Sequence, residues 1–348
     1  GEKQWITNSA FADIFIVYAK VDKDKITAFI VEKEYDGLSM GPEEKKMGLT
    51  GSSTRSLILE NVKVPVENVI GEIGRGHIIA FNVLNIGRFK ISSTALGTAK
   101  RSIELATKYA NERKQFHKPI SSFNLIKQKI ADMTIQVFAA ESSIYRTAGA
   151  MQKGFEEMKE NGAGYSKTIA HYAVECSMNK VLSSETLDFV IDEAVQIHGG
   201  YGYMGDYEVE TIYRDSRINR IFEGTNEINR IIIASTLLKS YTPQNYSIHL
   251  ENGPLQHEKK ILHLLKDYYH MAIQAIHQAN IDNMNEEQEI AEFLANLAIG
   301  IYSSESAILR AEKAIKQTGE EKNQQKIDCA KVYIHEIAQQ SAIVGLNL

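Results

Sequence analysis

The sequence contains little cysteine, which limits the kinds of site it can hold. Its two cysteines, Cys176 and Cys329, stand far apart, and neither has a second Cys or a His at metal-ligand spacing nearby. This pattern argues against a disulfide framework or a zinc site and favours a reducing compartment, the cytoplasm in a bacterium or the mitochondrion in a eukaryote. Cys176 lies in an apolar-periodic stretch, 173–181, which predicts a small buried thiol.

A strong excess of one charge and long apolar runs are also absent. The formal net charge is −5, with Lys and Arg interspersed among Asp and Glu, which argues against a nucleic-acid partner held mainly by phosphate contacts. No apolar run approaches the roughly 20 residues that a membrane-spanning helix needs. Hydrophobic residues at 43% and charged residues at 24% are typical of a globular protein, and 348 residues suffice for two or three domains.

The beginning of the sequence has no recognisable targeting segment. The first residue is Gly, and a strand-like run begins almost at once, so the start resembles the middle of a domain. Two β-rich runs, 14–18 and 26–31, flank a polar turn at 22–25 and predict a hairpin, and a further strand at 57–59 precedes Pro65. We interpret residues 1–73 as a partial antiparallel β domain within a longer protein.

After residue 76 the apolar period changes from two to 3.6. We predict three long helices and a short final helix for residues 74–241, with breaks at Gly154 and 161–164, which is the pattern of a four-helix bundle. Two faces carry the expected core: Ala99, Ile103, Ala106, Ala110 and Ile126, Ile130, Met133, Val137. The predicted fold class is mainly α with a partial antiparallel β domain.

Residues 242–348 form a predicted helical extension. A linker, Thr242 to Asn245, precedes two apolar stripes, one over 290–301 and one over 332–343. Such stripes are more often bundle core than membrane-binding surface, and peripheral membrane contact stays open. No closing element is recognisable at the end, which leaves a truncated extension open.

The segment 196–230 is densest in unusual residues. Gly200, Gly202 and Gly205 formally match a dinucleotide fingerprint, but they follow a helix rather than a strand, and no βαβ unit surrounds them. A Rossmann site is therefore not expected. The glycines are better explained by a backbone that closely approaches a large planar or phosphorylated ligand.

Glu223 is the strongest single candidate for a catalytic residue. It precedes a helix that Thr225 could cap, so the helix dipole favours its charged form while burial would raise its pKa. A base whose pKa rises when substrate expels water suits proton abstraction next to a carbonyl. Spacing alone favours an ordinary capping or salt-bridged glutamate, and the catalytic base is the alternative.

Three other residues have both a structural and a functional interpretation. Arg113 ends a helix with neighbouring cations, which stabilises the helix but would also allow it to grip a pyrophosphate. Trp5, the only tryptophan, is either a core residue or the wall of a planar cofactor site. Arg88 either faces solvent or meets an acidic ligand.

Taken together, these segments resemble the acyl-CoA dehydrogenase family. Each motif alone is modest, but their order and spacing across about residues 1–240 are specific. The helical tail and Gly87-Arg88-Phe89 resemble the very-long-chain branch, which implies a homodimer. The matching residues are Trp5-Ile6-Thr7-Asn8, Met47-Gly48 through Thr54-Arg55, Val64-Pro65, Gly87-Arg88, Arg113-x-Gln115-Phe116, Gln196-x-x-Gly199-Gly200-x-Gly202, Tyr213-Arg214-Asp215 and Phe222-Glu223-Gly224-Thr225.

The resemblance implies FAD as cofactor and assigns residues to it. Glu223 would be the catalytic base. The residues implied to bind FAD are Trp5 and Thr7 at the flavin ring, Thr225 and Glu227 near the phosphates, and, for the neighbouring subunit's FAD, Arg113, Gln115, Phe116, Gln196, Gly199 and Gly200. Those implied to hold the acyl-CoA are Arg88, Phe222 and Gly224. No metal is implied.

The implied reaction converts a fatty acyl-CoA to trans-2-enoyl-CoA in fatty acid β-oxidation. Glu223 would remove the α-proton while the β-hydrogen leaves as hydride to the flavin, and electrons would pass to an electron-transfer flavoprotein. The thioester carbonyl would be polarised by the Glu223 backbone N–H and a cofactor hydroxyl. Two rival functions are an acyl-CoA oxidase, which would release peroxide, and a non-catalytic scaffold.

Three departures from the family pattern affect this expectation. Glu227 replaces a more usual neutral or shorter side chain, which adds negative charge near the phosphates. His117 stands where a glycine usually follows, which could crowd the neighbouring cofactor, and the family's amino-terminal helical domain is missing from the sequence. We therefore expect this chain by itself to bind FAD poorly and to lack dehydrogenase activity. A yellow protein that turns over acyl-CoA would contradict this expectation.

Overall fold

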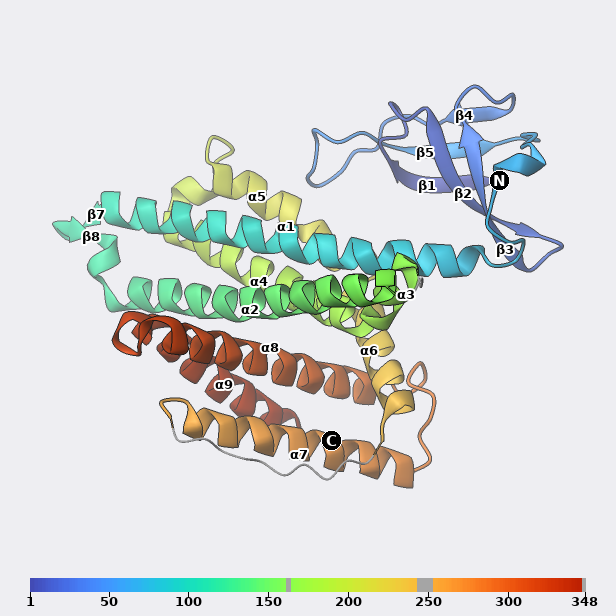
Figure 1. Cartoon of the computed structure of the whole chain (residues 1–348). Coiled ribbons are helices and arrows are strands. Elements are labelled where there is room, and N and C mark those ends of the chain that lie inside the picture. The colour runs from blue at the N-terminus through green and yellow to red at the C-terminus, as the bar shows by residue number, and fades with distance from the viewer. Residues whose placement is uncertain (161–163, 243–252, 346–348) are drawn as a thin grey trace. The chain divides into compact units, whose positions relative to one another are not determined.

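The computed structural model describes residues 1–160, 164–242 and 253–345 of the chain (Figure 1). The chain divides into two compact units, residues 1–84 and 85–348. Two of the expected sequence features, the linker at Thr242 to Asn245 and the break at 161–164, lie largely outside the described residues.

The first unit is built from antiparallel strands. Its two sheets have the orders β1-β5-β4 and β2-β3-β6. The predicted hairpin is confirmed, because β2 pairs with β3 in continuous register from Ile14 opposite Glu32 to Val21 opposite Lys25. The strands are β1 (Glu2–Thr7), β2 (Ile14–Val21), β3 (Lys25–Glu32), β4 (Leu38–Met40), β5 (Thr54–Leu59) and β6 (Val69–Ile70).

Buried and exposed side chains alternate along the strands of this unit, and the buried ones form a small core. Phe15 and Val17 of β2 are buried together with Val31 of β3 and Leu57 of β5. Ile14 and Ile16, which alternate with Phe15 and Val17 along β2, are exposed, as the two-residue period of a strand requires.

The second unit is helical. Among the described residues its helices are α1 (Gly76–Glu112, which begins in the first unit), α2 (Asn124–Glu160), α3 (Tyr165–His171), α4 (Ala173–His198), α5 (Glu208–Ser216), α6 (Asn226–Ser240), α7 (Gln256–Gln278), α8 (Gln288–Thr318) and α9 (Gln324–Gly345). A small hairpin, β7 (Lys114–Gln115) with β8 (Lys118–Pro119), follows α1. No described helix has the length and apolar character needed to cross a lipid bilayer.

Helices α1, α2, α4 and α5 share the predicted core. Small residues of α1, including Ala99 and Ala106, pack against Met133 and Val137 of α2 and Leu187 of α4. Both predicted faces therefore point inward. Cys176 on α4 is fully buried, as the apolar stretch around it predicted.

One predicted break is wrong. Gly154 lies inside α2, which continues to Glu160. A Cβ at this glycine would lie 2.9 Å from Thr168 Cγ2 on α3, so the glycine allows the two helices to pack closely rather than ending one of them.

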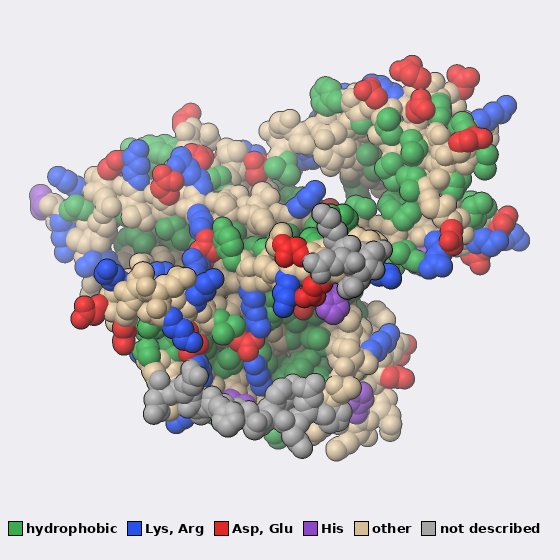
Figure 2. Space-filling model, in the orientation of Figure 1, with side chains coloured by type: hydrophobic (Ala, Val, Ile, Leu, Met, Phe, Trp, Pro, Cys, Tyr) green, Lys and Arg blue, Asp and Glu red, His purple; other side chains and the backbone are tan. Residues whose placement is uncertain are grey.

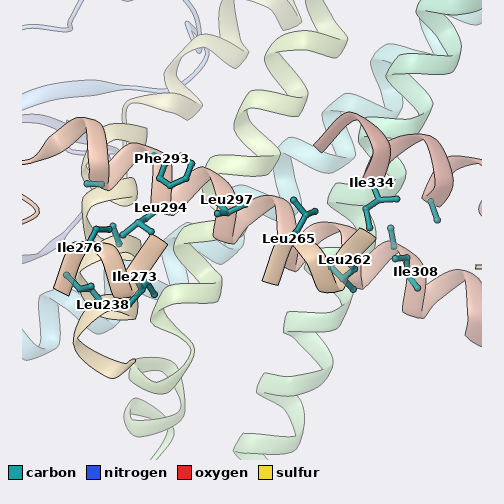
Figure 3. Packing of buried hydrophobic residues seen from close by; sticks show 14 of the residues in the cluster. Leu238, Leu262, Leu265, Ile273, Ile276, Phe293, Leu294, Leu297, Ile308 and Ile334 are labelled. Carbon is teal, nitrogen blue, oxygen red and sulfur yellow. The ribbon is translucent and has the colours of Figure 1, made fainter. Parts of the chain in front are cut away.

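The carboxy-terminal extension shares a core with the bundle. Leu238 of α6 belongs to the same buried cluster as Ile273 and Ile276 of α7 and Phe293 and Leu294 of α8 (Figure 3). Helix α2 packs on α4 on one side and on α8 and α9 on the other (Figure 1). The predicted stripe at 290–301 is thus packed against other helices rather than presented to a membrane.

Partly buried ion pairs also stabilise the packing of the extension. Glu305 of α8 accepts from Arg146 of α2 at 2.8 Å and from Lys266 of α7, and Arg310 of α8 pairs with Glu141 of α2 at 2.7 Å. Elsewhere on the face shown in Figure 2, basic and acidic side chains are interspersed, in line with the modest net charge.

Candidate active site

The turn before α6 carries the residue that the sequence singled out. Glu223 has φ +55° and Gly224 has φ +82°, so two consecutive residues adopt the left-handed conformation. For a glutamate this conformation costs on the order of 1–3 kcal/mol and persists only where the surroundings impose it. The turn is therefore held by its neighbours rather than by local preference.

Hydrogen bonds from three side chains hold the carbonyl groups of this turn. Arg88 Nε donates to Glu223 O at 3.1 Å, and Lys180 Nζ donates to Gly224 O at 2.9 Å. Asn229 Nδ2 also donates to Gly224 O, at 2.8 Å. The cap of α6 is Thr225, whose hydroxyl accepts from the Ile228 N–H at 3.3 Å.

Arg88 is engaged by the protein itself. Its side chain is only 5% exposed, and Nη1 donates to Asn85 Oδ1 at 2.9 Å and Ser177 Oγ at 3.4 Å. The alternative of a solvent-facing arginine is therefore wrong. The guanidinium contributes to the site through the backbone of Glu223.

The carboxylate of Glu223 lies against the backbone of α1. A Cβ built on Gly87 would be 2.7 Å from Glu223 Cδ and 2.8 and 2.9 Å from its two oxygens. Glu223 Oε2 is buried and has no hydrogen-bond partner within the described chain. Glycine at position 87 thus provides the space in which the carboxylate rests.

The interpretation of Glu223 as a helix-capping or salt-bridged glutamate does not describe this arrangement. Thr225 supplies the cap, and Glu223 forms no ion pair with any residue that the structure describes. Burial raises the pKa of the Glu223 carboxyl, while the charges of Arg88 and Lys180 lower it less. Both cations donate to backbone carbonyls of the turn and to neutral side chains rather than to the carboxylate, so its oxygens stay available.

Residues implied to hold the acyl-CoA surround the same turn. Phe222 is partly exposed beside Glu223. At Gly224 a Cβ would make only ordinary contacts, so it is the left-handed backbone, with φ +82°, that favours glycine there. Glu227 on the first turn of α6 is exposed. Hydrogen bonds from its own backbone N–H and Thr225 lower its pKa and keep it ionised.

A second group of predicted residues meets at the other end of α4. A pocket of about 500 Å³ is lined by Arg113, Gln115, Gly199 and Gly200 together with an aromatic wall. In that wall His198 stacks on Tyr109 with ring centroids 4.3 Å apart, and the Arg113 guanidinium lies over Tyr201. Lys180 and His198 are separated along α4 by about 27 Å at the usual helical rise, so the two sites are distinct.

Two residues assigned to the second group do not line that pocket. Gln196 is exposed on the last turns of α4, and Phe116 is 84% exposed at the tip of the β7–β8 hairpin. Phe116 and His117 both have positive φ, +50° and +65°. A two-residue hairpin turn of this kind favours glycine or asparagine, so an exposed Phe is held there at an energetic cost.

His117→Gly is expected to stabilise the chain by about 0.5–1 kcal/mol, because glycine adopts the left-handed conformation without strain. The greater conformational entropy that glycine gives to the unfolded chain offsets part of this gain. Urea unfolding followed by circular dichroism measures the change. Lys114→Gly on β7, at a residue without positive φ, is the matched control and should destabilise. A destabilising His117→Gly would mean that the imidazole makes a favourable contact there.

Trp5 and Thr7 belong to the first unit. A bulge between Lys3 and Ile6 interrupts the β1–β5 pairing, and Trp5 within it has φ +56° and a side chain 70% exposed. The core interpretation of this tryptophan is therefore wrong. Trp5, Phe116 and Glu223 share a strained left-handed backbone, which is a common property of functional positions.

Sequence reasoning missed Lys180, Asn229 and the role of Gly87. A usable signal existed for Lys180, because it is a charged residue inside the apolar-periodic stretch 173–181. Gly87 gave none, because it contacts a turn far away in the sequence, and Asn229, five positions after Gly224, looks like any other asparagine on a helix.

Comparisons with known proteins agree over most of the chain. A model described as acyl-CoA dehydrogenase, middle domain, matches residues 1–62, and two models described as acyl-CoA dehydrogenase, C-terminal domain, match 74–238 and 264–346. A probable acyl-CoA dehydrogenase of Bacillus subtilis is 51% identical over 97% of this chain and 60% of its own length.

Two further similarities extend this result. The mitochondrial very long-chain specific acyl-CoA dehydrogenase of Rattus norvegicus is 41% identical over 67% of this chain and 35% of its own. The crystal structure of an acyl-CoA dehydrogenase complexed with FAD from Bacillus anthracis has a TM-score of 0.93 and 50% identity, covering 99% of this chain and 61% of that one. The chain thus spans about 60% of the length of its Bacillus relatives.

Proposed function

The chain belongs to the acyl-CoA dehydrogenase family, and from that premise we propose that it carries the base and part of the cofactor site of an FAD-dependent acyl-CoA dehydrogenase. The reaction would remove one hydrogen from each of the α and β carbons of a fatty acyl-CoA and give the trans-2-enoyl-CoA. Glu223 would be the base.

One observation carries this proposal. The Glu223 carboxylate has a buried oxygen without a partner, although two cations lie nearby. A carboxylate bonded directly to Arg88 or Lys180 would be a weak base, because such a bond stabilises its charged form. Here both cations bond the carbonyls of the turn, which supports a carboxylate that is free to accept a proton.

The backbone of the same residue supports polarisation of the substrate. The Glu223 N–H donates to no atom of the described residues. A thioester carbonyl placed there would accept from this N–H, which would stabilise the negative charge that develops when the α-proton leaves. The α-proton would move to the Glu223 carboxylate. FAD, when bound, would supply the acceptor for the β-hydrogen and its electron pair.

The residues present fit FAD in two places. In the pocket at the end of α4, Arg113 offers a cation and Gly199 and Gly200 offer backbone without side chains, which suits a pyrophosphate. In the first unit the exposed Trp5, held out by a bulge, suits a flat ring. Glu227 is the exception, because an ionised carboxylate does not suit a phosphate.

The separation of the two sites on this chain supports assigning the pocket to the FAD of a neighbouring subunit. The pocket that contains Arg113, Gln115, Gly199 and Gly200 lies at the His198 end of α4, whereas Lys180, about 27 Å away along α4, bonds the turn that carries Glu223. A homodimer, a place in fatty acid β-oxidation and an electron-transfer flavoprotein as electron acceptor complete the proposal and rest on the family resemblance.

The test is turnover of a saturated acyl-CoA by the native protein. Reduction of an electron-transfer flavoprotein that requires Glu223 is the expected result. Peroxide release in air would identify an oxidase instead, and tight acyl-CoA binding without turnover would favour the scaffold.

A further inference from the structure

Lys180 is a buried lysine whose charge needs an explanation. Its side chain is 0% exposed, and it is the only lysine among the buried residues of the described chain. Removing an ammonium group from water costs several kcal/mol unless close partners compensate for it. Such a residue on α4 is retained at a cost to stability.

The partners of Lys180 are neutral groups at the base-bearing turn. Nζ donates to Gly224 O at 2.9 Å and to Asn226 Oδ1 at 2.7 Å. No ion pair joins it to a carboxylate within the described residues, although the charges of Glu223, Glu227 and Glu185 act on it through space. A neutral donor would serve a purely structural link with less desolvation, so the charge itself is the feature to explain.

We propose that Lys180 is a positioning residue for Glu223, which fixes the Gly224 carbonyl and uses its charge to keep the neighbouring carboxylate ionised in a buried site. This inference rests on the proposed function, in which Glu223 is the base.

The geometry gives Lys180 and Arg88 complementary tasks. Arg88 reaches from α1 to the carbonyl of Glu223, and Lys180 reaches from α4 to the carbonyl of the next residue, Gly224. Two successive peptide groups of a strained turn are thus fixed by two helices. Neither cation bonds the carboxylate, so both support ionisation without occupying the proton-accepting oxygen.

The charged groups around Lys180 set its ionisation. Burial lowers the pKa of Lys180 to about 8, and the positive charge of Arg88 on α1 lowers it as well. The acidic groups Glu227 of α6, Glu185 of α4 and Glu223 of the turn raise it. The ammonium form therefore predominates below pH 8, the range in which the base must ionise.

Lys180→Met removes the charge and the hydrogen bonds while keeping a similar shape. We expect kcat to fall about 10–100-fold, the scale of a small displacement of a catalytic group, with KM changed much less. The acid limb of the kcat pH profile should also move to higher pH, because Glu223 loses a cation that lowers its pKa. Exchange of the substrate α-hydrogen with deuterated water, followed by proton NMR, should slow in parallel.

Two further variants separate the parts of the proposal. Lys180→Gln keeps hydrogen-bond donors without the charge, so its acid limb should shift even if kcat at high pH recovers, and it remains informative if Lys180→Met does not fold. Asn179→Ala is the matched control. Asn179 is equally buried on α4 but bonds Ser143 and Thr147, so its loss should lower Tm and leave the acid limb in place.

The outcomes distinguish this inference from the proposed function. An unshifted acid limb and wild-type kcat in both folded Lys180 variants would overturn the role of Lys180 alone, provided that Glu223→Gln is inactive. Turnover that survives Glu223→Gln would instead overturn the proposed function, whatever Lys180 does.

Discussion

Glu223→Gln is expected to lower kcat for acyl-CoA dehydrogenation by about 10²–10⁴-fold, the usual contribution of a positioned general base. Glutamine matches the shape of glutamate and can occupy the space at Gly87, but it cannot accept the α-proton. Stopped-flow measurement of cofactor reduction at saturating acyl-CoA isolates this step in the native protein. Turnover near the wild-type rate would remove Glu223 from the mechanism.

The same substitution should raise stability at neutral pH. Burial raises the folded-state pKa of Glu223 above its unfolded value, so its stability contribution is fully present below pH 4.5 and is lost as pH rises through the folded pKa. Removing the charge should therefore stabilise the protein at pH 7 by about 1 kcal/mol, and this gain should vanish toward pH 4. For the wild type, kcat/KM should fall as pH decreases through that raised pKa.

Glu175→Gln is the matched control for both effects. Glu175 on α4 is also partly buried with a pKa raised mainly by burial, and it does not contact the turn at Glu223. Its replacement should change stability in the same direction and leave turnover unchanged. A similar loss of kcat in both variants would point to a general electrostatic effect rather than to the loss of a base.

Gly87→Ala is expected to lower kcat about 100-fold with little effect on folding. A Cβ at position 87 would lie 2.7–2.9 Å from the Glu223 carboxylate group, which is closer than nonbonded atoms allow. The clashing atoms are the end of a flexible side chain, so the carboxylate can swing aside while the helices stay in place. A displacement of this size costs a catalytic group about 100-fold in rate.

Gly97→Ala on the same helix is the control. A Cβ there meets no atom within 4 Å, so the substitution should stabilise α1 by about 0.5–1 kcal/mol and leave kcat unchanged. Steady-state kinetics and thermal unfolding of both variants give the comparison. Wild-type kcat in Gly87→Ala would show that the carboxylate does not need its present position over α1.

Local patterns in the sequence predicted much of the secondary structure. The β-rich runs at 14–18 and 26–31 predicted the hairpin that β2 and β3 form, and the 3.6-residue period predicted the inward faces of α1 and α2. The prediction at Gly154 was wrong because a glycine that ends a helix and one that admits a neighbouring helix look the same in sequence. Exposure of Trp5 was likewise not predictable, since it follows from a bulge in β-pairing.

The sequence by itself determined which groups stand together before α6, because Phe222-Glu223-Gly224-Thr225 places a carboxylate, a flexible residue and a helix cap in immediate succession. Only the tertiary structure decided which groups surround that carboxylate and which of them bond it. Arg88 is 135 positions from Glu223, and Lys180 is 44 positions from Gly224, so no local pattern links them. Their bonds to the carbonyls of the turn, and the space above Gly87, arise from the packing of α1, α4 and α6. Spacing along a chain specifies which residues are neighbours within one helix or strand. The surroundings that shift a pKa, or leave a carboxylate oxygen without a hydrogen-bond partner, depend on how separate helices pack.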